Sequence, residues 1–151
     1  MDQRATEHLI AAGETTAKTV RLSREEILAF ARMSHDTNPL HTDAQAAQRA
    51  RFGEIIASGQ HTAAMLMGML ATHYSRADDG VRREMLCLNM NFAFKGPVFA
   101  DQDVHLSWKV SAAQWNGKLQ GVLAHLDGHA SVTAGKPAVV ARGTILVKEA
   151  A

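Results

Sequence analysis

The apolar segment Ala63–Ala71 constrains this chain most, because none of its side chains is polar. Ser58 and Gly59 stand shortly before it and are typical of a helix start, so the sequence predicts a helix from about Ser58 through Ala71. A helix that is apolar on every side has to be enclosed rather than laid on a surface. Gly68 lowers the helix propensity by about 1 kcal/mol, which indicates close packing at that position. The rest of the chain must therefore surround one helix.

The residues after about position 85 predict strands rather than helices. Their apolar side chains alternate, and short loops with Gly, Pro or Asn separate the segments Leu86–Phe94, Asp103–Ala113, Leu119–Leu126 and Ala138–Val147. Loops this short join antiparallel neighbours. A further strand is predicted over residues 15–22, and helices over about 24–34 and from Asp43 to about Ala50. The predicted fold class is α+β, with an antiparallel sheet curled round the apolar helix.

Length, charge and cysteine content bound the organisation and partners of the chain. At 151 residues a single domain over 1–151 is expected, with its core at about 15–148. The net charge of +1 gives no electrostatic reason to expect a nucleic-acid or anionic-membrane partner. Cys87 is the single cysteine, which excludes an internal disulfide and a multi-cysteine metal site. Since the start of the sequence lacks the pattern of a signal peptide, we expect a cytoplasmic protein.

The loop after the first predicted helix holds the candidate catalytic pair. Asp36 and His41 flank the stiff dipeptide Asn38-Pro39, in a short loop where two side chains can be aimed at one point. A carboxylate and an imidazole that share one water form an acid–base pair. The same residue types also form ordinary turns, in which Asp36 or Asn38 binds only nearby backbone amides. Four residues of this loop have side chains of types that bind metals: His35, Asp36, His41 and Asp43. Their spacing matches no familiar metal site, so no metal is expected.

Three segments of the chain share residues with one known family. The segment Phe30–Ala46 resembles the signature loop of the MaoC-like hot-dog hydratases, which include the (R)-specific enoyl-CoA hydratases. In that loop an aromatic residue precedes Gly-Asp, Asn-Pro, an aliphatic residue and His. Phe52–Gly59 is similar to the family's approach to its central helix, and Asn91–Val98 to its Phe-x-x-Pro-Val stretch. The likeness covers nearly the whole chain, with two departures: His35 replaces the usual Gly, and Gln102-Asp103 replaces a Gly-Asp turn.

The resemblance implies a single hot-dog domain that hydrates trans-2-enoyl thioesters reversibly to (R)-3-hydroxyacyl thioesters. Asp36 and His41 would activate the water, and the free amide of Gly59 would bind the thioester oxygen. A tight turn into the helix would also explain this glycine. The implied substrate is a coenzyme A or acyl-carrier-protein thioester, used by a homodimer or higher homo-oligomer without a separate cofactor. Further substrate-binding candidates are Asn38, Ser58, Gln60 and Met65.

Two other functions fit the same fold. One is an acyl-CoA thioesterase, although residues 60–75 contain no Asp or Glu, which disfavours a mechanism with a carboxylate on the central helix. The other is a non-catalytic acyl-CoA-binding protein, in which His35 marks a decayed loop. Met65 fits core packing as well as an acyl pocket, and His61, in the first helical turn, is expected to face solvent. Dinucleotide, P-loop, zinc-protease and serine-hydrolase motifs are absent from the sequence.

Overall fold

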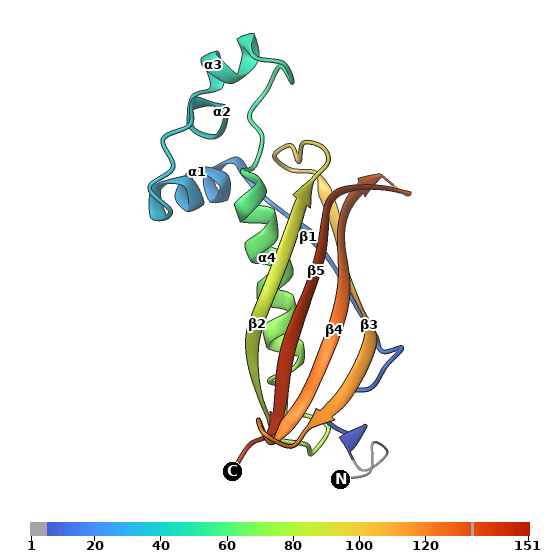
Figure 1. The fold of residues 1–151 in the computed structure, drawn as a ribbon. Helices are drawn as coiled ribbons and strands as arrows, with labels where there is room; N and C mark the ends of the chain where they lie inside the picture. The colour runs from blue at the N-terminus through green and yellow to red at the C-terminus, as the bar shows by residue number, and fades with distance from the viewer. Residues whose placement is uncertain (1–5, 134) are drawn as a thin grey trace.

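An antiparallel sheet curls around the helix α4 (Gly59–His73) in the computed structural model, which describes residues 6–133 and 135–151 (Figure 1). The sheet has the strand order β1-β3-β4-β5-β2. Its strands are β1 (Thr15–Arg21), β2 (Arg83–Phe94), β3 (Asp103–Asn116), β4 (Gly121–Thr133) and β5 (Lys136–Glu149). The helices α1 (Arg24–Met33), α2 (Pro39–Thr42) and α3 (Ala44–Arg49) lie together beside the start of α4 (Figure 1). This arrangement confirms the predicted α+β fold.

Local signals in the sequence set the starts of the three short helices. Ser23 Oγ accepts a hydrogen bond from the amide of Glu26 at 3.1 Å and so caps α1. Asp43 caps α3 by accepting from the amides two and three residues further on, at 2.9 and 3.2 Å. Asn38 caps α2 in the same way, at 3.1 Å. The short helix α2 was not predicted, although proline is favoured at the first helical position, where Pro39 stands.

The hairpin of β3 and β4 extends further than predicted. Trp115 and Asn116, assigned to a loop, lie in β3, whose pairing with β4 continues to Asn116 and Gly121. Trp115 is partly buried against the core, a long-range contact that the local turn signal does not reveal. Leu119 was predicted as the first residue of a strand but lies in the turn. Ala134, in the turn predicted before β5, lies outside the described residues.

Trp108 of β3 joins the sheet to the middle of α4. Its indole Nε1 donates a hydrogen bond to the backbone carbonyl of Leu66 at 2.9 Å, and its side chain is almost fully buried. Gly128 on β4 lies against the ring, and a Cβ there would stand 2.6 Å from it, so this position requires glycine. Leu66 and Leu70 are fully buried. The sheet therefore encloses one side of α4, as the apolar segment predicts.

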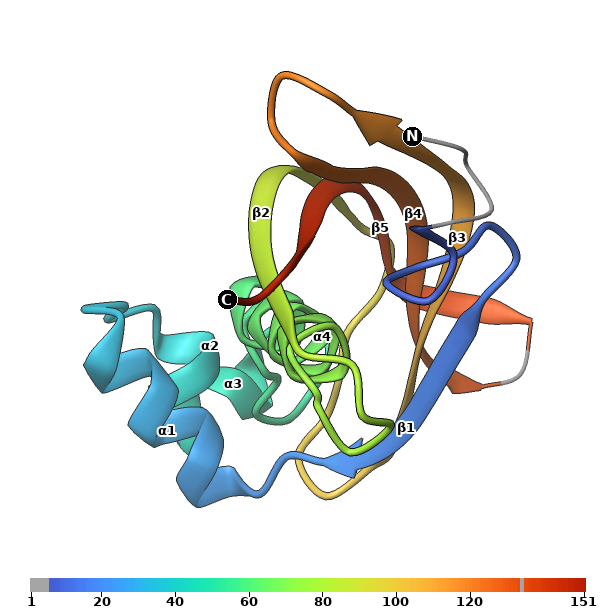
Figure 2. The same ribbon diagram turned by 90° about the horizontal axis from the view of Figure 1, so that it is seen from below.

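The opposite side of α4 is open. Ala64, Gly68 and Ala71 are exposed, and beyond the helix backbone no described atom lies within 4 Å of the point where a Cβ would stand at Gly68. The predicted close packing at Gly68 and the full enclosure of the helix are therefore wrong for a single chain. The reason is that the sheet curls round only part of the helix circumference (Figure 2). No helix in the described part of the chain, α4 included, has the length and apolar character needed to cross a bilayer.

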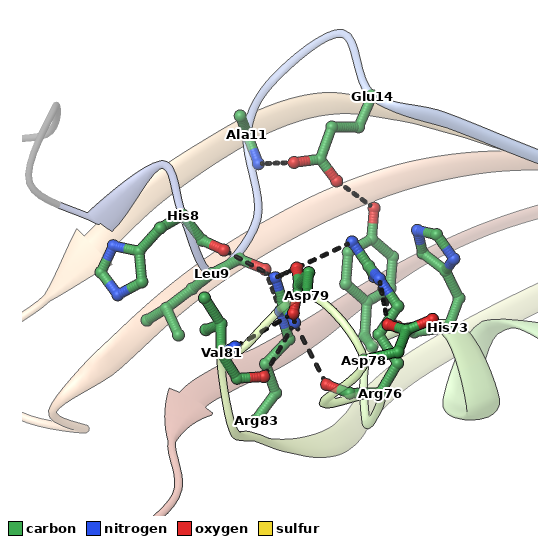
Figure 3. Close-up of polar contacts among 11 residues, drawn as sticks. His8, Leu9, Ala11, Glu14, His73, Arg76, Asp78, Asp79, Val81 and Arg83 are labelled. Atoms are coloured by element: carbon green, nitrogen blue, oxygen red, sulfur yellow. Dashed lines mark hydrogen bonds and ion pairs between the residues drawn. The ribbon is translucent and has the colours of Figure 1, made fainter.

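The buried guanidinium of Arg83 binds several segments together near the C-terminal end of α4 (Figure 3). The side chain of Arg83 is 2% exposed and donates to the backbone carbonyls of His8 at 2.7 Å and Leu9 at 2.9 Å. It also donates to both carboxylate oxygens of Asp79, at 2.9 and 2.7 Å, and to two carbonyls between α4 and β2. The hydrogen bonds from Arg83 lower the pKa of Asp79. One side chain thus joins the N-terminal segment to the connection between α4 and β2.

Replacement of Arg83 by Met should lower the free energy of unfolding by about 2–4 kcal/mol, because the carbonyls of His8 and Leu9 would lose their donor and Asp79 its counter-charge. Urea unfolding measures this loss. Arg142→Met is the matched control: Arg142 pairs with Asp127 at 3.1 Å, but its side chain is 85% exposed. The control should cost less than about 1 kcal/mol. Equal losses in the two variants would contradict a structural role for the buried guanidinium.

Candidate active site

The end of α1 fixes the backbone at Asp36. The amide of His35 donates to the carbonyl of Arg32 at 3.2 Å, and the amide of Asp36 donates to the carbonyl of Ala31 at 2.8 Å. These two bonds form a Schellman motif, which needs one residue in the left-handed region just past the helix. His35 takes that place with φ of 58°. The position at which the resemblance expects Gly thus has the conformation that Gly favours, and His35 preserves the path of the chain.

The carboxylate of Asp36 is held by two donors from different elements. The amide of Asn38 donates to its Oδ1 at 2.9 Å, and Nε2 of Gln60 donates to its Oδ2 at 3.0 Å. Gln60 lies in the first turn of α4, so this second bond ties the loop to the central helix. The Asp36 side chain is 18% exposed. Its orientation is therefore set by contacts and not by solvent.

His41, on α2, is buried and faces the same carboxylate. Its Nδ1 lies 2.6 Å from the backbone carbonyl of Ile56. Because a carbonyl only accepts, Nδ1 carries the proton in this bond, which leaves the lone pair of Nε2 free in the neutral ring. Nε2 lies 4.0 Å from Oδ2 of Asp36. That distance is too long for a direct hydrogen bond and allows one water to bond both atoms.

The start of α4 lies at the same place. Ser58 Oγ accepts from the amide of His61 at 3.2 Å and caps the helix. The amides of Gly59 and Gln60 come first in the helix and have no intrahelical acceptor. A Cβ at Gly59 would stand 2.5 Å from the ring of Phe94, so any larger residue would displace this ring. The φ of Gly59 is not in the left-handed region, and a strained turn is not the reason for this glycine.

A cavity of about 700 Å³ contains most of the predicted site residues. Its lining comes from the α1–α2 region, the segment before α4, the first turn of α4 and the loop after β2. The predicted residues that meet there are Asp36, Asn38, His41, Ser58, Gly59 and Gln60. Met65 lies elsewhere, in a second cavity of about 390 Å³ between α4 and β1. The structure thus gathers the loop pair and the helix start at one cavity.

Several of these side chains serve the architecture of the cavity. Asn38 and Ser58 were predicted to bind substrate. Their side-chain oxygens instead accept hydrogen bonds from backbone amides and cap α2 and α4. Gln60, also predicted to bind substrate, donates to Asp36. The carbonyl of Ile56 and the ring of Phe94 were missed by sequence reasoning. Phe94 stands in one of the segments that carry the resemblance, whereas no sequence pattern marks a carbonyl.

His61 was expected to face solvent and is instead buried. Its ring stacks on Phe30 of α1, with centroids 4.3 Å apart and an interplanar angle of 2°. Burial lowers its pKa, and its Nδ1 has no hydrogen-bond partner among the described residues. The cause is that α1 packs over the first turn of α4, a long-range contact. In residues 6–133 and 135–151, no three His, Cys, Asp or Glu side chains gather where they could hold a metal ion.

The left-handed backbone at His35 gives a direct stability test. His35→Gly should raise the free energy of unfolding by about 0.5–1 kcal/mol, because glycine removes the steric cost of that conformation. His35→Val should lower it, since a β-branched side chain tolerates a positive φ poorly. Thermal and urea unfolding of both variants measure the difference. A less stable glycine variant would contradict the Schellman geometry.

Comparison with known proteins extends these findings. The chain is 27% identical over 100 residues to a mitochondrial 3-hydroxyacyl-[acyl-carrier-protein] dehydratase of Arabidopsis thaliana, a match covering 66% of this chain and 55% of the relative. It is 29% identical over 100 residues to the (R)-specific enoyl-CoA hydratase of Aeromonas caviae, covering 66% and 70% of the two chains. The chain spans about half the length of the plant relatives that it matches.

Solved structures show the same architecture. The (R)-hydratase structure from A. caviae has a TM-score of 0.78 at 26% identity, covering 93% of this chain and 98% of that one. A MaoC-like dehydratase from Rhodospirillum rubrum shares the fold, with a TM-score of 0.76 at 22% identity and coverage of 94% and 95%. The model of the family described as "MaoC like domain" matches residues 7–124, most of the chain. This chain therefore belongs to the MaoC-like domain family, as the three sequence segments predict.

Proposed function

We propose that this chain catalyses the reversible hydration of trans-2-enoyl thioesters to (R)-3-hydroxyacyl thioesters. One observation carries the proposal: Asp36 and His41 face each other across 4.0 Å, shielded from solvent, in the cavity at which α4 begins. The similarity to proteins named as a 3-hydroxyacyl-[acyl-carrier-protein] dehydratase and an (R)-specific enoyl-CoA hydratase supports the same reaction and its stereochemistry. Water is the only co-reactant, so the reaction needs no resident cofactor or metal.

The reaction adds one water across a double bond. Nε2 of His41 accepts a proton from a water that also donates to Oδ2 of Asp36, and the water oxygen bonds to C3 of the substrate. The electron pair of the C2–C3 double bond shifts toward the thioester oxygen and forms an enolate. The enolate then takes a proton at C2 from the imidazolium of His41, which restores the neutral ring. The product carries both hydrogens and the oxygen of the water.

The free amide of Gly59 would stabilise the enolate. Negative charge that develops on the thioester oxygen is favoured at a helix N-terminus, where backbone N–H groups have no internal partner. The position of Gly59 in the cavity that holds Asp36 and His41 supports this role. Because the donor is a backbone group, its contribution of about 10²- to 10³-fold in rate is independent of side-chain identity. The substrate carrier in the proposal is coenzyme A or an acyl carrier protein, and the cytoplasmic location stays a prediction.

Asp36→Asn and His41→Ala should each reduce the hydration of crotonyl-CoA by at least about 10²-fold while the variants stay folded. The loss is expected because Asp36→Asn removes the negative charge beside the water, and His41→Ala removes the group that accepts its proton. Loss of enoyl absorbance measures turnover, and chiral analysis identifies the 3-hydroxy product. Asp101→Asn and His129→Ala are matched controls, since both positions are exposed and outside the cavity.

Three results would contradict the proposal. Full activity in both cavity variants would remove the pair from the mechanism. Release of free thiol from acyl-CoA without hydration would identify a thioesterase. Binding of crotonyl-CoA with no turnover in the unchanged protein would identify a non-catalytic acyl-CoA-binding protein.

We also propose that two copies of the chain form a homodimer. The open side of α4 exposes Ala64, Gly68 and Ala71, and the neighbouring strand β2 exposes Leu86 and Leu88. β2 is an edge strand in the described sheet, so the backbone groups on its outer side have no strand partner. Apolar side chains and a free edge on adjacent elements are features of an association surface. Pairing of β2 with a second copy would cover both at once.

Gly68→Leu tests the dimer. In a single chain the added side chain meets open space and improves helix propensity, so folding should be unharmed. In a dimer it would separate the two α4 helices and raise the dissociation constant by at least about tenfold. Ala29→Leu, on the exposed side of α1, is the matched control. Sedimentation velocity should give a dimer for the unchanged chain and the control; a monomeric unchanged chain, or an unaffected Gly68→Leu dimer, would contradict the proposal.

A further inference from the structure

Two exposed cationic residues line the cavity of Asp36 and His41. Arg51 comes from the segment between α3 and α4, and Lys95 follows β2 directly. Both residues are exposed, and neither forms an ion pair with a carboxylate in residues 6–133 and 135–151. Two segments far apart in the sequence thus bring positive charge to one cavity.

Each of the two cationic residues has one contact that holds part of it in place. The amides of Lys95 and its neighbour Gly96 both donate to the carbonyl of Ala138, at 2.8 and 3.2 Å. The guanidinium carbon of Arg51 lies 5.3 Å from the ring centroid of Phe52. A cation over an aromatic face is held there by the ring quadrupole. The backbone of Lys95 and the guanidinium of Arg51 therefore have defined positions at the cavity.

The charge of the cavity is divided between its interior and its edge. Asp36 is the single carboxylate among the described lining residues, and it is shielded and already bonded to Asn38 and Gln60. The exposed charges of Arg51 and Lys95 are left without a counter-ion in the described chain. Uncompensated cations at the mouth of a cavity attract an anionic ligand or an anionic part of one. The ligand that enters here should carry negative charge at the end that stays outside.

We propose that Arg51 and Lys95 bind a phosphate group of the thioester carrier. The inference rests on the proposed function, in which the thioester lies beside Asp36 and His41. Coenzyme A and the prosthetic group of acyl carrier proteins share a pantetheine arm that ends in a phosphate, so the phosphate lies at the opposite end of the arm from the thioester. A guanidinium and an ammonium are the side chains that bind phosphate most strongly. The two cations thus recognise the carrier, while the pair inside the cavity acts on the acyl group.

Substrates with and without phosphate separate this role from catalysis. For crotonyl-CoA, Arg51→Ala and Lys95→Ala should each raise KM about threefold, and the double variant about tenfold, with kcat nearly unchanged. For the crotonyl thioester of N-acetylcysteamine, which has no phosphate, kcat/KM should be the same in all variants. Lys118→Ala, an exposed lysine outside the cavity, is the matched control. Added salt should raise KM for crotonyl-CoA less in the double variant than in the unchanged chain.

Direct binding gives a readout that does not depend on turnover. Calorimetric titration of coenzyme A, 4′-phosphopantetheine and pantetheine should show tighter binding of the two phosphorylated compounds, and the double variant should lose that difference. Equal affinity of coenzyme A and 4′-phosphopantetheine would assign the site to the phosphate that both carriers share. Tighter binding of coenzyme A, abolished by the substitutions, would assign it to the nucleotide phosphates.

Failure of this inference differs from failure of the proposed function. If the chain hydrates both crotonyl thioesters and the rim substitutions change neither KM nor the binding of coenzyme A, the phosphate site is wrong and the hydratase proposal stands. If no thioester is hydrated but phosphorylated compounds bind through Arg51 and Lys95, the hydratase proposal is wrong and the phosphate site stands. Equal binding of pantetheine and coenzyme A would overturn the phosphate site in either case.

Discussion

The hydrogen bond from Gln60 to Asp36 is the contact on which the arrangement of the cavity depends. It joins the loop that follows α1 to the first turn of α4. It also fixes the position of the carboxylate oxygen that faces His41. Without it, Asp36 would be held only by the neighbouring amide of Asn38, within its own turn. The loop would then resemble the ordinary turn that its composition also permits. A single amide side chain thus converts local turn geometry into a pair of groups at a defined separation.

The contact can position Asp36 because α4 is itself held in place. The helix is anchored along its length by burial of Leu66 and Leu70 and by the hydrogen bond from Trp108 of the sheet. At its far end, Arg83 ties the chain that follows α4 to the N-terminal segment. Because both anchors lie away from the cavity, the first turn of α4 is a fixed reference against which α1 and α2 pack. Rigid elements of this kind place side chains more accurately than loops alone.

Much of the fold could be predicted from the sequence because its signals are local. Ser23, Asp43 and Ser58 cap helices within three residues of themselves, and alternation marks the strands. The pair Asp36 and His41 could be named because both stand in one short loop. The role of Gln60, the burial of His61 under α1 and the contact of Gly59 with Phe94 could not, because each joins segments that are distant in sequence. The open side of α4 was mispredicted for a related reason. An apolar helix face in the sequence does not show whether the rest of the same chain covers it.

A crystal structure of the chain with butyryl-CoA, a saturated thioester that cannot be hydrated, tests the central claim most directly. It should show one water within hydrogen-bond distance of both Asp36 Oδ2 and His41 Nε2, with C3 of the acyl group beside it and the thioester oxygen at the amide of Gly59. A thioester bound outside this cavity, or Asp36 and His41 turned to different solvent molecules, would contradict an Asp–His pair acting on a shared water.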